Sequence, residues 1–551
     1  MKNNLRKKVV GVSMAAAVAF SSLSFAVNNE LAEAQDKKNQ PTNVIMMVMD
    51  GTSAGATSLA RWYKGENLAM DEIVIGAVRT HSAESAITDS APAATALATG
   101  YKSNDKVIGL LPQEVNTPGV DAINPKDAYK PVANVLEGAQ LAGKSTGIIS
   151  TSEIQHATPA GFSAHAAHRS NYQDIAEQQV YQGIDVVLGG GKESLAPGTT
   201  RNARVDGENL LDVIDENGYD FVETRDALLN STSEKIWGSF APSALAYDFD
   251  RQAKKNSEPS IAEMTKKAID TLSKNDKGFF LFVEGSKVDW AAHGNDTVGI
   301  ISDVLAFDDA VKEALDFAKK DGNTMVIAVS DHGNSGITMG NVNTNSTYPA
   351  IPVSDYIEPL KKASMTLEGA LSQLNSDRSN MKEVAELYGL DGLTPEEVNS
   401  LKASKTVHTD MAKMLANRAN IGYSTGGHTG EDVFLYAYGP SKPYGLVDNT
   451  DIAKTMASFM GVDLDSTTDK LFVNAKESFE KKGYTTRIDV TDAKNPVFVA
   501  EKKNLKIELP INKNIAEVTQ NKKTFTKQLD GVTVYNGKDF YVAQNALNLS
   551  K

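Results

Sequence analysis

The sequence predicts an α/β fold with a doubly wound, largely parallel central sheet and helices on both faces. Short, continuous apolar runs recur along the chain, as is typical of strands buried on both faces. Helical stretches separate these runs, and strand alternating with helix in chain order favours crossover connections between parallel strands. The apolar runs cover residues 43–49, 146–150, 279–283, 324–330 and 433–436.

Two helices between the runs have clear sequence signals. Ser260 and Glu263 form a capping box, which satisfies free amides at a helix start. Apolar residues with helical spacing follow this box, and they are Ile261, Met264, Ala268 and Leu272. A second stripe with the same spacing consists of Ile300, Val304, Phe307, Val311 and Leu315. Both patterns fit helices that cover a sheet.

The first 34 residues are predicted to be a signal peptide. Basic residues precede an apolar run at 9–26, and two small-x-small cleavage sites end at Ala26 and Ala34. An uncleaved membrane anchor is the alternative, but the small residues and the polar stretch at 28–40 favour cleavage. No other segment is apolar enough to cross a bilayer. We therefore expect a secreted, extracellular or cell-surface-associated protein with no transmembrane anchor.

The remainder divides into a predicted catalytic domain at 35–484 and a predicted C-terminal β-rich module at 485–551. Within the catalytic domain, residues 334–425 separate two motifs and form a long predicted insertion near the active site. In the tail, apolar residues alternate from Leu505 to Ile511, and Asn536-Gly537 is a hairpin signal. An integral edge of the main domain is the alternative for this tail.

Composition narrows the possible classes of function. The 551 residues carry a formal charge of −14, so we expect no nucleic-acid-specific binding. An anionic substrate must then be attracted by a local positive site, and bound metal ions can provide one. Cysteine is absent, which excludes disulfides, thiolate zinc sites and cysteine nucleophiles.

Three acidic residues come at the ends of apolar runs. They are Asp50, Glu284 and Asp331. Each one alone is more often a turn residue than a ligand, but the carboxyl ends of parallel strands are where active sites of such folds gather. Three acids in equivalent places therefore indicate a site.

Three histidines have neighbours that suit metal binding. His332 directly follows an aspartate, and His428 lies in a glycine-rich stretch at 425–430. His293 comes four residues after Asp289, and residues with this spacing share one face of a helical turn. Because the chain has no thiolate, histidine and aspartate are its only ligands for a tight zinc site.

The segment at 88–100 contains a candidate nucleophile. Ser90 begins a run of small residues from Ala91 to Ala98, which predicts a tightly packed helix. By default such a serine caps the helix. The functional alternative is that the helix start, with its free amides, stabilises a bound phosphate and the serine oxyanion. Since no base lies nearby in the sequence, a metal would have to lower the pKa of the hydroxyl.

These motifs, in this order, resemble those of the alkaline phosphatase family. The TDSA and ATALATG stretches around Ser90 are similar to the nucleophile signature of that family. The HATPA, EG, DWAAH, SDH and HTG stretches are similar to its metal-binding segments. The resemblance runs from Asp50 to His428. It implies hydrolysis of phosphate monoesters to alcohol and inorganic phosphate through a phosphoserine intermediate, with two Zn²⁺ ions and one Mg²⁺ ion as cofactors.

The resemblance also implies a role for each matching residue. It assigns the first zinc to Asp289, His293 and His428, and the second zinc to Asp50, Asp331, His332 and the nucleophile Ser90. It assigns magnesium to Asp50, Thr158 and Glu284, and the binding of two phosphate oxygens to Arg169.

Two positions depart from the best-studied bacterial pattern. His156 stands where that pattern has an acid, and Trp290 stands where it has a lysine; the same pair resembles animal and cold-adapted bacterial members. With Asp89, we expect these side chains to lie directly behind the ligands. Because the exchange removes one negative and one positive charge near the third metal, we expect a weakly bound magnesium ion.

The sequence leaves rival functions open. Other enzymes of the same superfamily act on phosphodiesters or sulfate esters or are phosphomutases, but the presence of Thr158, Glu284 and Arg169 favours a monoesterase. A non-catalytic surface protein that uses metals for stability is a different class, which the complete ligand set disfavours. The resemblance further suggests a homodimer.

Overall fold

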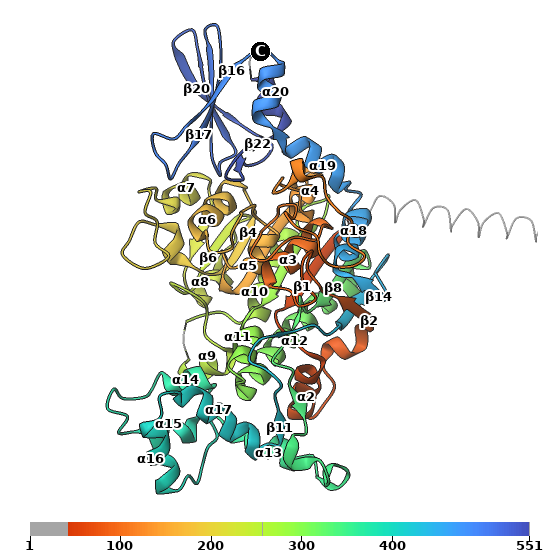
Figure 1. The fold of residues 1–551 in the computed structure, drawn as a ribbon, viewed down its shortest axis with the longest axis vertical. Helices are drawn as coiled ribbons and strands as arrows, with labels where there is room; N and C mark the ends of the chain where they lie inside the picture. The colour runs from red at the N-terminus through yellow and green to blue at the C-terminus, as the bar shows by residue number, and fades with distance from the viewer. Residues whose placement is uncertain (1–41, 256, 550–551) are drawn as a thin grey trace, which may run out of the picture.

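The computed structural model of the protein describes residues 42–255 and 257–549, and the predicted signal peptide lies outside them. A ten-stranded sheet forms the centre of the molecule (Figure 1). Its strands, in order across the sheet, are β14 (Gly445–Asp448), β2 (Val74–Arg79), β13 (Val433–Tyr438), β8 (Thr324–Val329), β1 (Asn43–Met49), β7 (Phe279–Gly285), β3 (Ser145–Glu153), β4 (Val186–Gly190), β6 (Ile236–Ser239) and β5 (Asp220–Val222). All neighbours are parallel except the two pairs that β13 makes, so the predicted fold class is confirmed.

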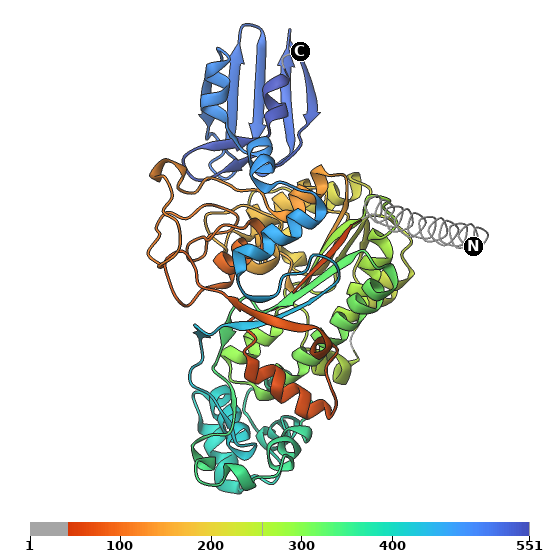
Figure 2. The same cartoon turned by 90° about the vertical axis from the view of Figure 1, so that its right-hand side faces the viewer.

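Helices cover both faces of the sheet (Figure 2). On one face lie α2 (Ala54–Lys64), α10 (Ile261–Leu272) and α12 (Thr297–Asp321); on the other lie α3 (Ser90–Thr99), α4 (Val135–Leu141) and α18 (Asn449–Met460). Alternate residues of β1 enter the two cores: Met47 packs in the first and Met46 in the second. Because both faces are buried, the strand is apolar throughout, which is why it was recognisable in the sequence.

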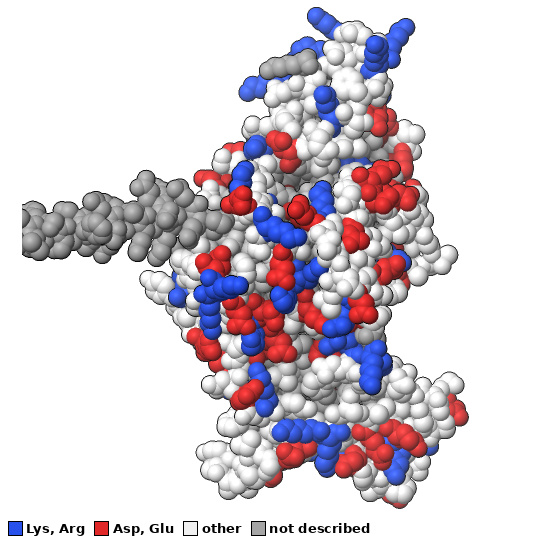
Figure 3. Space-filling model, turned by 180° about the vertical axis from the view of Figure 1, so that it is seen from behind, with Lys and Arg blue, Asp and Glu red and all other residues white. Residues whose placement is uncertain are grey.

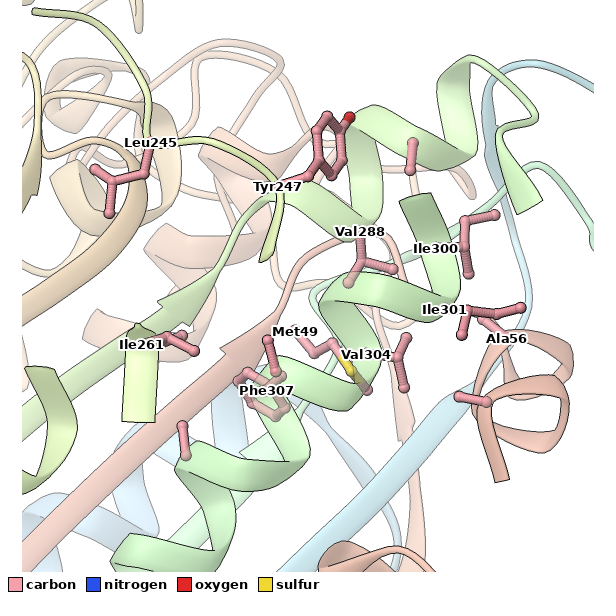
Figure 4. Close-up of a cluster of buried hydrophobic side chains, with 14 of the residues drawn as sticks. Met49, Ala56, Leu245, Tyr247, Ile261, Val288, Ile300, Ile301, Val304 and Phe307 are labelled. Carbon is pink, nitrogen blue, oxygen red and sulfur yellow. The ribbon is translucent and has the colours of Figure 1, made fainter. Parts of the chain in front are cut away.

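The two predicted helices are confirmed. Ser260 caps α10 in a capping box with Glu263, and the apolar stripe of this helix is buried. Figure 4 shows Val304 and Phe307 of α12 close to Met49 at the end of β1. The predicted stripes thus anchor the helices that flank the strand ends.

The segment between two of the motif-bearing stretches contains five helices, drawn at the lower end of Figure 1. They are α13 (Ser354–Lys361), α14 (Leu367–Leu371), α15 (Met381–Leu387), α16 (Pro395–Ala403) and α17 (Val407–Arg418). Their apolar residues join the core of the α12 face. Glu368 of this segment lies 3.8 Å from Lys287, two residues before Asp289, so the insertion touches the region of the predicted site.

The C-terminal residues form an antiparallel sheet of their own, at the upper end of Figure 1. Its strands are β16 (Thr485–Asp489), β17 (Val497–Lys502), β18 (Leu505–Pro510), β19 (Ile515–Gln520) and β20 (Lys523–Gln528). A separate apolar cluster lies under this sheet and includes Phe479 of α20 (Ala475–Lys481). The predicted Asn536-Gly537 turn joins β21 (Val534–Tyr535) to β22 (Phe540–Val542). The tail is therefore β-rich, as predicted, and is not an edge of the central sheet.

Within residues 42–255 and 257–549, no helix is long and apolar enough to cross a membrane.

Candidate metal centre and nucleophile

Three acidic side chains meet at the carboxyl ends of three adjacent strands. Asp50 follows β1, Glu284 lies near the end of β7, and Asp331 follows β8, in the sheet order β8-β1-β7. All three are at most 1% exposed. Asp50 Oδ1, Glu284 Oε1 and Asp331 Oδ2 have no hydrogen-bond partner within the described residues. Buried carboxylate oxygens without donors are costly, so this cluster requires cations or protons.

The pKa values of the three acids are all raised, which also indicates a site for cations or protons. Burial and the neighbouring charges of Asp331, Asp289 and Glu284 raise the pKa of Asp50 well above its usual value. Burial also raises the pKa of Asp331, and it raises the pKa of Glu284 to about 7. Bound cations would reverse these shifts, because an opposite charge nearby favours the ionised form. The donor set therefore fits hard or borderline metal ions.

A first predicted ligand set lies on the more open side of the site. Asp289 Oδ2 is 3.4 Å from His293 Nε2, Asp289 Oδ1 is 3.6 Å from His428 Nε2, and the two Nε2 atoms are 3.2 Å apart. Asp289 and His293 belong to the short helix α11 (Lys287–His293), as their spacing predicted. The third member comes from β12 (His428–Thr429), so the fold joins segments that are far apart in the sequence.

The backbone fixes the tautomers of both rings. His293 Nδ1 lies 2.9 Å from the carbonyl of Gly426, and His428 Nδ1 lies 2.7 Å from the carbonyl of Thr88. Because a carbonyl only accepts, each Nδ1 must donate, so in the neutral rings the lone pair of each Nε2 is directed at the other. Rings held in this way are ready to bind a metal ion.

A second predicted ligand set adjoins the candidate nucleophile. His332 Nε2 lies 3.3 Å from Asp331 Oδ2, 3.5 Å from Asp50 Oδ1 and 3.2 Å from Ser90 Oγ. The ring of His332 also stacks on that of His428 at 3.6 Å, so the two sets are contiguous. Burial first and His428 second lower the pKa of His332 to about 3, so its ring is neutral and can act as a ligand.

The third predicted set lies deeper. Thr158 Oγ1 donates to Asp50 Oδ2 at 3.3 Å, and Asp50, His156 and Glu284 each bring an oxygen or ring nitrogen within 4.8 Å of the others. Asp50 thus takes part in both the second and the third set. Thr158 belongs to α5 (Ala157–Gly161) and is wholly buried. Oxygen ligands such as these suit magnesium.

Ser90 is the first residue of α3. The side chain that caps the helix is that of Asp89, which accepts from the Ala91 amide at 3.2 Å. The default interpretation of Ser90 as the cap is therefore wrong. Since a neighbour fills the capping role, the hydroxyl of Ser90 is free to face His332 at the helix start, where amides and dipole favour an anion.

Arg169 is held from two sides. It forms an ion pair with Asp89, and its NH2 group donates to His156 Nε2 at 3.1 Å. The edge of the His156 ring meets Trp290, with ring centroids 5.7 Å apart. Burial first and Arg169 second lower the pKa of His156 to about 3, so its ring is neutral and accepts. The two positions that depart from the bacterial pattern thus support the arginine.

Two contributing residues were missed from the sequence. Asn334 Nδ2 donates to Asp289 Oδ1 at 2.7 Å, and Ser150 Oγ donates to Glu284 Oε2 at 2.5 Å. Asn334 directly follows the SDHG stretch, and Ser150 is the last residue of the predicted strand at 146–150. Both positions therefore lie next to segments that the sequence had already indicated as part of the site or the sheet. Their partners lie more than 40 residues away, which local patterns cannot show.

The fold and the site together define an α/β enzyme in which clusters of candidate cation ligands adjoin Ser90. The chain belongs to the alkaline phosphatase family, whose profile matches residues 41–462. It is 37% identical to alkaline phosphatase 4 of Bacillus subtilis over 82% of this chain and 96% of that protein. It is 31% identical to the alkaline phosphatase of Schizosaccharomyces pombe over 78% of this chain and 84% of that protein. The protein is therefore a phosphatase.

Solved structures agree with this assignment. The cold-active alkaline phosphatase of Shewanella sp. superposes with a TM-score of 0.65 at 28% identity, covering 76% of this chain and 99% of that one. The alkaline phosphatase of Thermus thermophilus superposes with a TM-score of 0.67 at 27% identity, covering 77% and 94%. A variant of the TAB5 alkaline phosphatase, described with Mg bound in its M3 site, superposes with a TM-score of 0.55 at 26% identity, covering 77% and 99%.

Proposed function

We propose that the protein hydrolyses phosphate monoesters to alcohol and inorganic phosphate through a phosphoserine at Ser90. The observation that carries this proposal is the position of Ser90 Oγ, 3.2 Å from His332 Nε2 at the junction of the ligand sets. A serine at a helix start and beside cation ligands has what a nucleophile for phosphoryl transfer needs.

Two zinc ions and one magnesium ion are the proposed cofactors. Asp289, His293 and His428 would hold the first zinc ion; Asp50, Asp331, His332 and Ser90 would hold the second; Asp50, Thr158 and Glu284 would hold magnesium. The opposed Nε2 lone pairs and the unpartnered carboxylate oxygens support this division. The TAB5 variant with Mg in its M3 site supports a third ion of this kind.

When bound, these ions would act as Lewis acids that favour the alkoxide of serine, the hydroxide form of water and the departing alkoxide. The side chains of the protein position the reactants. Ser90 Oγ would lose its proton and form a bond to phosphorus while the bond from phosphorus to the ester oxygen breaks, and the departing alkoxide would take up a proton to become the alcohol. Water would then attack the phosphoserine, releasing phosphate and restoring the hydroxyl group.

Arg169 would bind the phosphoryl group throughout. Its planar guanidinium can donate two parallel hydrogen bonds to two phosphate oxygens. Asp89 and His156 fix its orientation before substrate arrives, so little reorganisation is needed. Because phosphoryl transfer has a loose transition state, positioning and charge neutralisation account for most of the catalysis, and many alcohol leaving groups should be accepted.

A chromogenic phosphate monoester tests this function. We expect turnover that rises from pH 7 to 10, is lost on chelation and returns only when zinc and magnesium are both restored. The Ser90→Ala variant should fold normally and lose on the order of 10⁴- to 10⁶-fold in kcat. Faster turnover of phosphodiesters or sulfate esters than of monoesters would instead favour the other enzymes of the superfamily.

We also propose that the protein is exported and forms a homodimer. Support for a dimer comes from exposed apolar side chains at one edge of the sheet. Phe434 and Leu446 flank Ala77 in register across β13, β2 and β14, and exposed Tyr444 lies directly before the outermost strand, β14. Exposed apolar side chains on neighbouring strands are typical of interaction surfaces. A monomeric mass in solution by light scattering at working concentrations would contradict the dimer.

A further inference from the structure

The C-terminal sheet has a different charge balance from the rest of the protein. The chain contains 56 basic and 70 acidic residues, whereas residues 485–551 contain eleven basic and seven acidic ones. The profile of the family ends at residue 462, so these residues lie beyond the part that relatives share through it. A basic module on an acidic enzyme calls for an explanation other than phosphate hydrolysis.

Four lysines of this module, together with two at the end of the preceding helix α20, lie at one end of the module. Six exposed lysines, here called the lysine tip, occupy the end of α20, the turn between β17 and β18, and the turn between β19 and β20. They are Lys481, Lys482, Lys502, Lys503, Lys522 and Lys523. Figure 3 shows blue side chains gathered at the upper end of the module, with red side chains lower down.

Hydrogen bonds and register fix the tip as one surface. Lys502 Nζ donates to the carbonyl of Lys482 at 2.6 Å, which joins the first turn to the end of α20. Asn504 and Asn521 are hydrogen-bonded to each other, which joins the first turn to the second. In register, Lys502 lies opposite Leu505, then Gln520, then Lys523, so Lys502 and Lys523 are three strand spacings, about 14 Å, apart on one face.

The charges of the tip are not neutralised by the protein. No carboxylate of the described residues lies within 4.0 Å of any of the six ammonium groups. The adjacent acids have other partners: Glu480 accepts from Thr486, and Glu501 lies 3.9 Å from Arg487. Lysine on an edge strand often serves only to prevent pairing with another sheet. That role accounts for Lys523 and Lys527 in β20, but not for lysines in two turns and at a helix end.

The tip faces away from the catalytic domain. The opposite end of the same sheet carries Asn512, which bonds with Gln178, Glu177 and Asp174 of the catalytic domain. Since β18 and β19 run between the two ends, the tip lies at the far end of the module (Figure 1). A partner bound there would not obstruct the phosphatase site.

We propose that the lysine tip binds a linear, flexible polyanion that carries phosphodiester groups. Lysine ammonium groups are point charges that match a chain of separate anionic groups, whereas none of the six residues is an arginine, whose planar guanidinium would favour bidentate recognition. The turns present no apolar side chain that could insert into a bilayer, because their residues are lysine and asparagine. They also present no aromatic platform for stacking bases. A polymer without bases is thus favoured over a membrane or a nucleic acid.

The test compares the intact, metal-loaded protein with two matched triple variants. Lys503→Asn, Lys522→Asn and Lys523→Gln neutralise the tip, and asparagine suits the positive φ of 56° and 68° at the two turn positions. The control, Lys382→Gln, Lys402→Gln and Lys405→Gln, removes the same charge from exposed sites of the insertion. Monoester hydrolysis should be equal in all three proteins and shows that each is folded.

Binding to immobilised poly(glycerol phosphate) is then measured from 20 to 200 mM salt. We expect wild type and control to bind alike, and the tip variant to bind at least tenfold more weakly at low salt. Its slope of log affinity against log salt should be smaller by about 2, the loss of three phosphate contacts on a flexible strand. Equal binding by the tip variant, or binding of the wild type to anionic vesicles but not to the polymer, would overturn the proposal.

Discussion

The Nε2 atoms of His293 and His428 lie 3.2 Å apart, and each ring points its Nδ1 at a backbone carbonyl. Two lone pairs that face each other at this distance repel unless a cation lies between them. The ring orientations are imposed by the carbonyls of Gly426 and Thr88, which belong to separate loops. The site is therefore preorganised for a metal ion by backbone that contributes no ligand itself.

Replacement of one of these rings should remove one zinc ion. We expect His428→Ala to lose one of two bound zinc ions, measured by elemental analysis after dialysis against a weak chelator. The melting temperature should fall as well, because an ion present at a free concentration of about 100 times its Kd stabilises the folded state by about 2.7 kcal/mol. Exposed His408 belongs to none of the ligand sets, so His408→Ala should keep both ions. Full zinc content in His428→Ala would contradict the assignment.

Asn334 should matter for zinc affinity although it is no ligand. Its amide donates to Asp289 Oδ1 at 2.7 Å and to the Asp289 carbonyl at 3.3 Å. Loss of such an orienting contact typically weakens metal binding by about 10- to 100-fold. We expect this loss in Asn334→Ala, measured by competition with a zinc indicator. Exposed Asn345→Ala is the control, and an unchanged affinity in Asn334→Ala would show that Asp289 needs no support.

His156 should limit the affinity for magnesium. The residue lies with Asp50 and Glu284, yet its Nε2 accepts from Arg169 and its Nδ1 has no partner in the described part of the chain. An acid at this position would add an oxygen ligand, so we expect His156→Asp to bind magnesium more tightly. Wild type should regain activity with magnesium after mild chelation, whereas the variant should keep its ion. Equal magnesium affinity by calorimetry would refute this explanation.

A buried ion pair should make stability depend on pH. His165 Nε2 lies 3.0 Å from Glu137 Oε1. Burial lowers the pKa of His165, but the charge and hydrogen bond of Glu137 and the hydrogen bond to the Gly109 carbonyl raise the pKa by more. The pKa of His165 in the folded protein is therefore above 6.5. The pair thus contributes fully below pH 6.5 and loses its contribution as pH rises through the folded pKa.

The variant His165→Gln isolates this effect. We expect the difference in unfolding free energy between wild type and variant to be largest near pH 6 and to shrink toward pH 9, in urea titrations at fixed metal concentrations. Taking the difference between the two proteins cancels the pH dependence of metal binding, which they share. A difference that grows with pH would mean that the buried imidazole is neutral in the folded protein.

Asn512 should hold the C-terminal sheet to the catalytic domain. Its buried amide donates to Asp174 and Glu177 and accepts from Gln178 at 2.9 Å, in a left-handed backbone with φ of 64°. Asn512→Ala leaves buried polar groups unpaired and should cost about 2–3 kcal/mol, with about 1–2 kcal/mol more from the backbone. Asn512→Gly keeps the backbone favourable and isolates the hydrogen-bond loss. Melting temperatures of both variants equal to wild type would show that the module docks independently of this contact.

Much of the fold could be predicted because a strand that is buried on both faces consists of a continuous apolar run, which can be recognised in the local sequence. The run at 43–49 is an example, and it corresponds to an observed strand, as the capping box at Ser260 corresponds to an observed helix. The strands β4 and β6 were missed, since short runs such as 186–190 resemble buried helix segments. The antiparallel direction of β13 could not be predicted from the sequence either, because the apolar content of a strand does not distinguish parallel from antiparallel neighbours.

The sequence by itself determined the chemistry available to this protein: carboxylates, imidazoles, one serine in a small-residue helix and no thiol. Local spacing also paired Asp289 with His293, because a helical turn brings residues four apart together. Only the tertiary structure decided that His428 completes that pair, that Asp89 rather than Ser90 caps α3, and that the lysines of two turns meet at one tip. The contact of His428 joins segments more than 100 residues apart, and a contact of that range depends on sheet order and packing, which no local pattern contains. The other two relationships are short in sequence, but they depend on where α3 begins and on which strands pair, and the sequence pattern left both open.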